Sequence, residues 1–142
     1  MAQLRSIVVR ALVLTSCTWL LVSVTAPAAA QGGDGWQIPQ NAAAEANPVP
    51  AGDAAVAKGK GLYKSKCQRC HGAAGKGDGP EADPDHMPSD LTDGSRAARN
   101  PDGVLFYKMW NGRRKPKMPA FSTDLSREDV WALVHYVKTL RK

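Results

Sequence analysis

Apolar residues recur at helical spacing close to the C-terminus, where they line one face of a predicted helix. Ser126 begins this segment and Asp129 follows three residues later, which resembles a capping box with Asp in its last position. Basic residues at the far end suit the negative end of the helix dipole. The predicted apolar face comprises Val130, Leu133, Val134, Val137 and Leu140.

Two further helices are predicted upstream. The first extends over Ala54–Lys66 with Asp53 as its N-cap. The second follows Asn100-Pro101, an N-cap and a proline at the first helical position, and ends at Gly112. No stretch alternates apolar and polar residues convincingly, and the Gly, Asp and Pro content of residues 72–99 indicates a loop. Three helices around so long a loop form a poor core unless something large occupies the centre.

A short apolar run near the N-terminus predicts a secretory signal peptide. Residues 11–24 are nearly all apolar, two arginines precede them, and small residues lead up to Ala30. The run is 14 residues long, which is shorter than the roughly 20 that span a bilayer. We therefore expect residues 1–30 to be cleaved off after Ala30 during export. An uncleaved anchor and lipoprotein processing at Cys17 are the alternatives.

Composition narrows the class of protein further. The chain has 142 residues, and removal of the leader leaves 112, which suits one domain and not a two-domain enzyme. The mature part carries 17 Lys and Arg against 13 Asp and Glu, a formal charge of +4. Its cysteines are Cys67 and Cys70, and a disulfide across so short a loop stabilises a fold poorly. A domain this small is therefore expected to need a stabilising feature other than a disulfide.

Residues 31–52 form a Gly-, Pro- and Ala-rich extension ahead of a domain that covers residues 53–142. That composition is typical of a flexible tether. Trp36 and Ile38 are unusual in a tether, however, because large apolar side chains favour burial. A tether and a segment folded back onto the core therefore both fit the sequence.

Residues 67–71 are Cys-Gln-Arg-Cys-His, the attachment signature of a c-type haem. Two thiols at this spacing can form thioethers to the two vinyl groups of one porphyrin, and His71 can then bind the iron. A thioredoxin-like dithiol would need a βαβ context and has no use for the histidine. A zinc site would need four ligands, and the other histidines, His86 and His135, are too dispersed to complete one.

The iron needs a second axial ligand, and Met118 is the best placed candidate. It lies 47 residues beyond His71, between the second and third predicted helices. Pro116 and Pro119 stiffen an extended segment around it and hold the thioether with little backbone freedom. Ligation by His and Met raises the reduction potential and fills both axial positions, which suits electron transfer.

The other candidates for this position fit less well. Met109 and His135 fall inside predicted helices, where a core methionine and a satisfied histidine are the more ordinary roles. His86 and Met87 follow the attachment motif so closely that the opposite face of the ring is awkward to reach. His86 is the next candidate after Met118.

The domain resembles a class I, single-haem cytochrome c of the bacterial periplasmic type over about residues 54–142. The Cys-x-x-Cys-His-Gly motif at residues 67–72 and the Met118-Pro119 pair carry most of this resemblance. Weaker matches are residues 59–63, 77–80, 88–92, Gly112 and 131–137.

The resemblance implies an all-α cytochrome c fold, with three or more helices wrapped around one covalently attached haem c. It implies that the first and last helices cross where Gly59 and Tyr63 meet Tyr136. In that family a backbone carbonyl, usually that of a proline, orients the proximal imidazole. Pro88 is the expected residue here and Pro80 the reserve.

The expected function is electron transfer in the periplasm, by a soluble carrier that is not an enzyme. Haem c is expected to bind through Cys67 and Cys70, with His71 and Met118 as axial ligands and no membrane segment left after signal cleavage. A haem subunit of a larger oxidoreductase, or a haem enzyme or sensor with a labile sixth ligand, are the alternatives. The apolar pocket is expected to include Leu91, Trp110, Phe121 and Leu125.

Two groups of basic residues are expected to border the haem edge and to bind an acidic surface on a redox partner. Nucleic acid is a poor alternative for an exported protein of such modest charge, and a solvated loop that only aids solubility is the simpler interpretation. The first group precedes Met118 and comprises Arg113, Arg114, Lys115 and Lys117. The second lies near the attachment motif and comprises Lys64, Lys66, Arg69 and Lys76.

Overall fold

The computed structural model describes residues 30–32 and 35–142, so residues 1–29 of the predicted signal peptide lie outside the described part. The described part is mostly helical, with one two-stranded antiparallel sheet near its start. In chain order its elements are β1 (Ala30–Gly32), β2 (Trp36–Ile38), the 3-10 helix η1 (Gln40–Ala44), α1 (Asp53–Lys66), α2 (Gln68–His71), the 3-10 helix η2 (Gly94–Arg96), α3 (Asp102–Asn111) and α4 (Arg127–Thr139).

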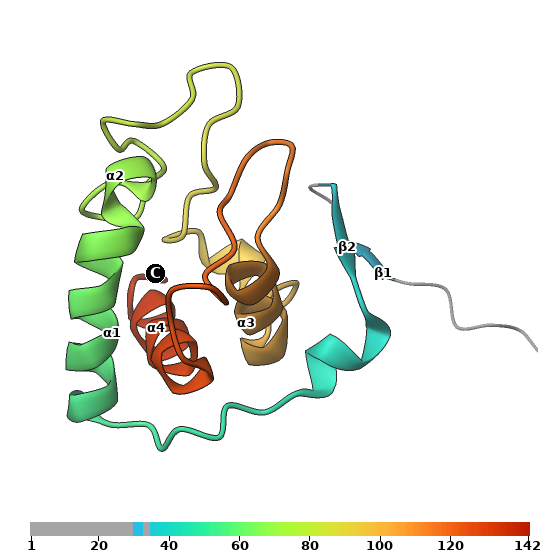
Figure 1. Ribbon diagram of the computed structural model, residues 1–142, viewed down its shortest axis with the longest axis vertical. Helices are drawn as coiled ribbons and strands as arrows, with labels where there is room; N and C mark the ends of the chain where they lie inside the picture. The colour runs from blue at the N-terminus through green and yellow to red at the C-terminus, as the bar shows by residue number, and fades with distance from the viewer. Residues whose placement is uncertain (1–29, 33–34) are drawn as a thin grey trace, which may run out of the picture.

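Helices α1 and α4 cross in direct contact, as the resemblance implied (Figure 1). A Cβ added at Gly59 would strike the carbonyl oxygen of Ala132 and the Cβ of Tyr136, so only glycine permits this approach. One turn further on, the rings of Tyr63 and Tyr136 pack with their centroids 5.2 Å apart. The crossing therefore depends on the glycine and aromatic positions that the sequence analysis identified.

The ends of the helices follow the predicted signals with two corrections. The capping box at the start of α4 is present, since Ser126 and Asp129 exchange both of its hydrogen bonds. Helix α1 is capped by Gly52 rather than Asp53, which is its first helical residue. Helix α3 is capped by Pro101 rather than Asn100, because the Asn100 side chain instead donates to the Arg96 carbonyl and accepts from Lys108.

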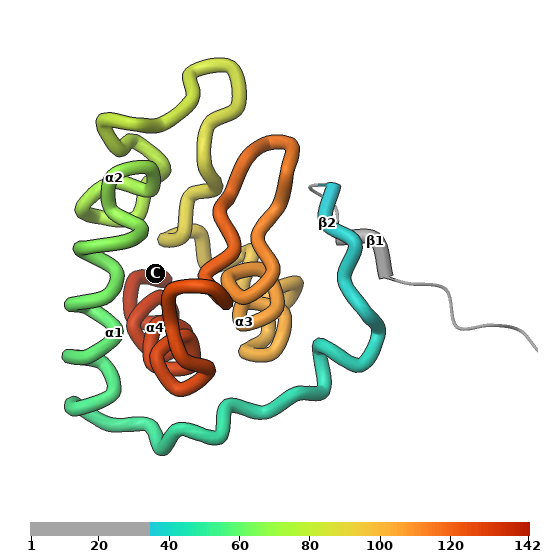
Figure 2. The backbone as a smooth tube through the Cα atoms, viewed as in Figure 1, coloured from blue at the N-terminus to red at the C-terminus, as the bar shows by residue number. Residues whose placement is uncertain are grey.

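The N-terminal extension is folded back onto the core. Trp36, Ile38 and Ala42 are buried together with Val104 of α3. Beyond η1 the chain runs along the helices to the start of α1 (Figure 2). On this path the Asn47 side-chain amide donates to the Trp131 carbonyl at 3.0 Å, which attaches the extension to α4.

The long loop between α2 and α3 has few regular elements but many backbone hydrogen bonds. Leu91 donates to the Gly75 carbonyl at 2.7 Å, which folds the loop back on itself. Gly77 has φ +84°, and a Cβ there would strike the Pro88 carbonyl oxygen. The two limbs of the loop therefore pack with backbone against backbone, next to the end of α2.

Candidate haem site

The two cysteines of the motif lie at the junction of α1 and α2. Cys67 is the C-cap of α1, where its N–H donates to the Tyr63 carbonyl at 2.9 Å, and it is also the N-cap of α2. Both thiols are free and half-buried. Burial, with a smaller contribution from Cys70, raises the pKa of the Cys67 thiol to about 12. A thiolate is costly at this position, whereas a neutral thioether pays no such penalty.

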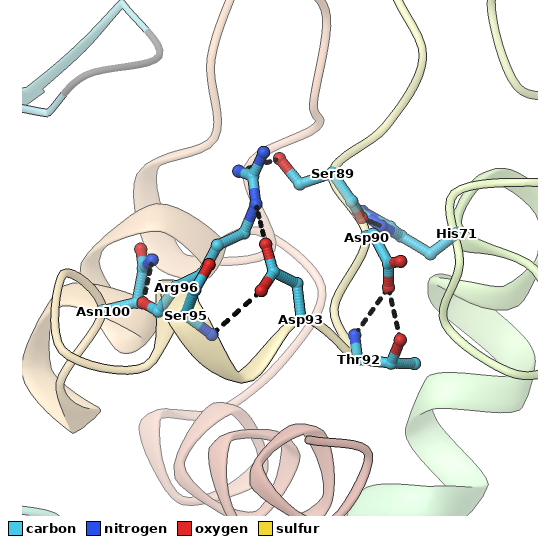
Figure 3. Close-up of polar contacts among 8 residues, drawn as sticks. All are labelled: His71, Ser89, Asp90, Thr92, Asp93, Ser95, Arg96 and Asn100. Carbon is cyan, nitrogen blue, oxygen red and sulfur yellow. Dashed lines mark hydrogen bonds and ion pairs between the residues drawn. The ribbon is translucent and has the colours of Figure 1, made fainter. Parts of the chain in front are cut away.

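His71 closes α2 and points its ring toward the long loop (Figure 3). Its Nδ1 lies 3.3 Å from the carbonyl oxygen of Ser89. Because a carbonyl oxygen only accepts, Nδ1 must carry the proton, which leaves the Nε2 lone pair for a metal. Burial lowers the pKa of His71, against a smaller opposing effect of the Ser89 contact, and favours the neutral ring that ligation requires.

The residue that orients His71 is therefore Ser89, and the expectation of Pro88 or Pro80 is wrong. The physical reason lies in the path of the loop. The Pro88 carbonyl faces Gly77 instead, so the next carbonyl along the chain turns toward the imidazole.

A network of polar contacts fixes the loop around Ser89 (Figure 3). Asp90 accepts hydrogen bonds from the N–H and the hydroxyl of Thr92, at 2.8 and 2.7 Å, and these bonds lower the pKa of Asp90. Arg96 contacts the Ser89 hydroxyl at 3.4 Å and pairs with Asp93 at 3.4 Å. Sequence reasoning missed this network, for which the only local signal is the Asp-x-Thr and Asp-x-Ser spacing of short turns.

Met118 is half-buried in the loop that follows α3, which we call the methionine loop (residues 112–123). Met118 and Arg113 form an antiparallel bridge with hydrogen bonds of 2.7 and 2.8 Å. Gly112 has φ +62°, and a Cβ there would crowd the Met118 carbonyl oxygen and the Ala120 nitrogen. The loop is thus held by backbone pairing as well as by the prolines that the sequence analysis considered.

The other candidate ligands are buried in the core, hydrogen-bonded to the backbone or exposed on the surface. Met109 is buried in the main core, and the Nε2–H of His135 donates to the Val49 carbonyl at 2.8 Å. His86 lies on the surface with its Nδ1 3.2 Å from Asp83, and Met87 is 56% exposed. Met118 packs against both hydrophobic clusters of the described part, which distinguishes it from Met87.

The apolar residues that were expected to surround the haem belong to the main hydrophobic cluster or pack against it. Phe121 is buried, while Leu91, Trp110 and Leu125 are half-buried against the same cluster. Among the described residues, no three His, Cys, Asp or Glu side chains gather into a group that could hold a metal ion. Two free thiols, a neutral imidazole with an available Nε2, a thioether and an apolar lining fit haem c.

A mostly helical fold that carries a Cys-x-x-Cys-His motif defines a c-type cytochrome domain. The sequence matches the family described as cytochrome C oxidase, cbb3-type, subunit III, over residues 54–137. The chain belongs to this family of cytochrome c domains. Membership of this family implies electron transfer by a covalently bound haem c.

The chain is also similar to parts of several solved structures. A chain of the reducing HAO-like protein complex of Kuenenia stuttgartiensis is 29% identical with a TM-score of 0.55, and the match covers 69% of this chain and 50% of that one. The c-type cytochrome KustC0563 is 30% identical with a TM-score of 0.48, over 59% and 98%. Cytochrome CL of the marine methylotroph Methylophaga aminisulfidivorans is 21% identical with a TM-score of 0.49, over 61% and 53%.

This chain spans about half the length of the first of these structural relatives. A search of curated proteins finds no match. Within the described residues, no helix has the length and apolar character needed to cross a membrane.

Proposed function

We propose that this protein is a periplasmic electron carrier with one haem c, bound through thioethers from Cys67 and Cys70. His71 and Met118 are the axial ligands in this proposal. The mature protein consists of the extension of residues 31–52 and the cytochrome domain of residues 53–142, and the leader of residues 1–30 directs export. The haem supplies a reversible one-electron iron couple.

The observation that carries the proposal is the environment of His71. Its Nδ1–H donates to Ser89, and burial favours the neutral ring, so Nε2 is ready to bind iron. The free thiols of Cys67 and Cys70 precede it by four residues and one residue. The hydroxyl of Tyr63 donates to the Gly72 carbonyl at 2.7 Å and fixes the chain just beyond the ligand.

The methionine loop supports the second axial ligand. Its bridge between Arg113 and Met118 limits the movement of the thioether before any haem is bound. A second hydrogen bond, from Phe121 N–H to the Met109 carbonyl at 3.0 Å, ties the end of the loop to α3. A preorganised thioether of this kind favours a filled sixth position and a raised potential.

A role as the haem subunit of a larger oxidoreductase is the second candidate. It is favoured by the similarity to one chain of a reducing HAO-like protein complex, of which this chain spans half. Both candidates use the same site. Size-exclusion chromatography of the native protein from periplasm distinguishes them, since a subunit elutes with its complex.

Three of the cations expected to bind an acidic partner make contacts within the chain. Arg113 packs over the Trp36 ring at 4.5 Å and donates to the Pro116 carbonyl, so it supports the loop. Lys66 pairs with Asp124, and Arg69 pairs with Glu81, each at 3.3 Å. The remaining exposed cations before Met118 are Arg114, Lys115 and Lys117.

The optical spectrum of the purified protein tests the proposal. We expect a low-spin ferric haem with a weak near-infrared band from Met ligation, and a polypeptide mass increased by one covalent haem. A high-spin ferric spectrum would instead favour a haem enzyme or sensor with a labile sixth ligand, and loss of haem on denaturation would exclude thioether attachment.

A further inference from the structure

Two loops of opposite charge extend toward the same end of the molecule, the upper end in Figure 1. One is the methionine loop, which contains four Lys and Arg residues and no Asp or Glu. The other is the acidic segment (residues 77–93), which contains six Asp and Glu residues and no Lys or Arg. The charge of this end is therefore divided between two segments rather than spread as a basic ring.

The charges at the tips of both loops are available to a partner. Arg114, Lys115 and Lys117 are exposed, and their side chains have no ion pair within the described part of the chain. On the acidic segment, the Asp83 carboxylate is 58% exposed and contacts only its local neighbours, the His86 ring and the Asp85 N–H. The Asp85 side chain is exposed without a partner among the described residues. Opposite charges therefore face solvent on the two loops.

Each loop supports one of the proposed axial ligands, so this inference rests on the proposed function. The acidic segment contacts His71 through the Ser89 carbonyl, and the methionine loop contains Met118. With His71 and Met118 as axial ligands, the two loops would lie on opposite sides of the haem. A protein that docks over the haem edge meets a positive loop on one side and a negative segment on the other.

We propose that this face binds a second copy of the same chain and supports electron exchange between the two haems. In a pair related by a twofold axis, each methionine loop lies against the acidic segment of the other copy, so one surface is complementary to itself. One electron passes from the ferrous haem of one copy to the ferric haem of the other. The first is oxidised, the second is reduced, and no other reactant is consumed.

The net charge of the protein and the local charges of the two loops predict opposite effects of salt on the rate of this exchange. The mature chain has a formal charge of +4, so two copies repel each other at a distance and added salt would speed up their encounter. At contact, the loop charges lie within the Debye length of about 10 Å and dominate. Attraction between the complementary loops makes added salt slow the exchange.

The experiment measures electron self-exchange in the mature holoprotein. Partly reduced samples are examined by NMR, and the line broadening of the haem methyl resonances gives the bimolecular rate. Between about 10 and about 200 mM ionic strength we expect this rate to fall roughly threefold or more. A rate that rises or stays constant with salt overturns the proposal.

A pair of charge-reversal variants separates loop charge from net charge. The loop variant combines Lys115→Glu with Lys117→Glu, which lowers the formal charge from +4 to 0. The control variant combines Lys60→Glu with Arg99→Glu, which changes the net charge equally but at exposed residues outside both loops. We expect the first variant to exchange several-fold more slowly than wild type at low salt. The second is expected to exchange at least as fast as wild type. If the loop variant is as fast as this control, the self-complementary surface is disproved.

Spectroscopy of the same samples separates a failure of docking from a failure of the proposed function. A haem that lacks the near-infrared Met band or a reversible iron couple contradicts the proposed ligands, whatever its exchange rate. A normal spectrum and couple together with exchange that rises with salt contradicts only the pairing of two copies.

Discussion

His71 and Met118 depend on different kinds of support. The imidazole is oriented by one backbone carbonyl, that of Ser89, in a loop pinned by short polar contacts. Met118 is positioned by paired backbone hydrogen bonds with Arg113 and by a glycine that lets the loop pass over the end of α3. The Ser89 contact uses the His71 ring itself, whereas the Arg113–Met118 bridge uses backbone atoms only. Substitution of Met118 should therefore leave the methionine loop in place.

Replacement of the proposed distal ligand tests this independence. Met118→Ala should abolish the near-infrared band of the ferric protein while the haem stays attached to the polypeptide. Axial ligands set haem potentials over about 0.8 V, so we expect the midpoint potential to fall by on the order of 0.1 V. Optical spectroscopy and protein-film voltammetry measure the two effects.

Met87→Ala is the matched control for this substitution, because Met87 is 56% exposed and lies outside both hydrophobic clusters. It should change neither the near-infrared band nor the potential. If the band disappears in Met87→Ala and survives in Met118→Ala, the assignment of the distal ligand is wrong.

At the scale of the elements, the contact between α1 and α4 positions the attachment motif. Helix α1 ends at Lys66, one residue before Cys67, so its placement on α4 sets where the thiols lie. The contact is close because Gly59 faces the backbone of α4. The capping box at Ser126 fixes the beginning of α4 and Lys58 of α1 pairs with Asp129 of that box at 2.9 Å.

Two glycines of α1 provide an internal comparison for the packing of this contact. Gly59→Ala places a methyl group against Ala132 and should destabilise the holoprotein by about 1–3 kcal/mol through overpacking. Gly61→Ala adds its methyl group in open space and should stabilise by about 0.5–1 kcal/mol through helix propensity. Guanidinium unfolding followed by circular dichroism measures both changes, and equal effects would show that α1 does not pack on α4 through Gly59.

The capping box predicts a dependence of stability on acid pH. Hydrogen bonds from Lys58 and then Ser126 lower the pKa of Asp129 from its ordinary value of 3.8 to about 2. A depressed pKa means that the stabilisation is present above about pH 4 and is lost as the pH falls toward 2. Asp129→Ala should therefore cost about 1 kcal/mol at neutral pH, and its deficit against wild type should shrink across that window.

Glu128→Ala serves as the control for Asp129, because Glu128 also contacts Lys58, at 3.1 Å, but takes no part in the capping box. We expect a loss of at most about 0.5 kcal/mol from this exposed pair at neutral pH. Thermal unfolding of both variants between pH 2 and pH 7 makes the comparison. A deficit for Asp129→Ala that is constant over this range contradicts the assignment.

At the scale of the whole molecule, the N-terminal extension and the methionine loop form one packed unit on α3. Trp36 is buried against Val104, and Met118 packs against the same cluster. The guanidinium of Arg113 lies over the Trp36 ring, 4.5 Å from its centroid. The extension therefore supports the loop that carries the proposed distal ligand, although it precedes the cytochrome domain in the sequence.

Replacement of Trp36 should make Met118 easier to displace from the ferric iron. Trp36→Ala deletes a large buried side chain, a change that costs about 3–5 kcal/mol in well-packed sites. If about 1.4 kcal/mol of that loss reaches the methionine loop, imidazole should displace Met118 from ferric iron at about tenfold lower concentration. Titration of the near-infrared band with imidazole measures the shift.

Gln37→Ala alters the adjacent, exposed residue of the same strand and should leave this titration unchanged. A Trp36→Ala protein with the wild-type imidazole midpoint would show that the extension does not support the distal side. Such a result would leave the assignment of Met118 itself intact.

The sequence by itself determined the parts of this protein that depend on neighbouring residues. The attachment motif, the capping box of α4 and Gly112 at the end of α3 each follow from residue type and spacing. The glycine–tyrosine contact of α1 was implied by the family resemblance. These features could be predicted because their chemistry is local or belongs to a family pattern. They were sufficient to indicate the haem and the helical fold.

Tertiary structure alone decided the backbone contacts and the pairing of charges. Every residue has a carbonyl group, so only the path of the loop determined that Ser89 rather than Pro88 faces His71. The bridge between Arg113 and Met118 likewise uses backbone atoms that any residue supplies. The pairing of Arg69 with Glu81 depends on where their segments fold, which residue type does not specify. Long-range contacts of this kind depend on the path of the whole chain, because no local spacing encodes which atoms will meet.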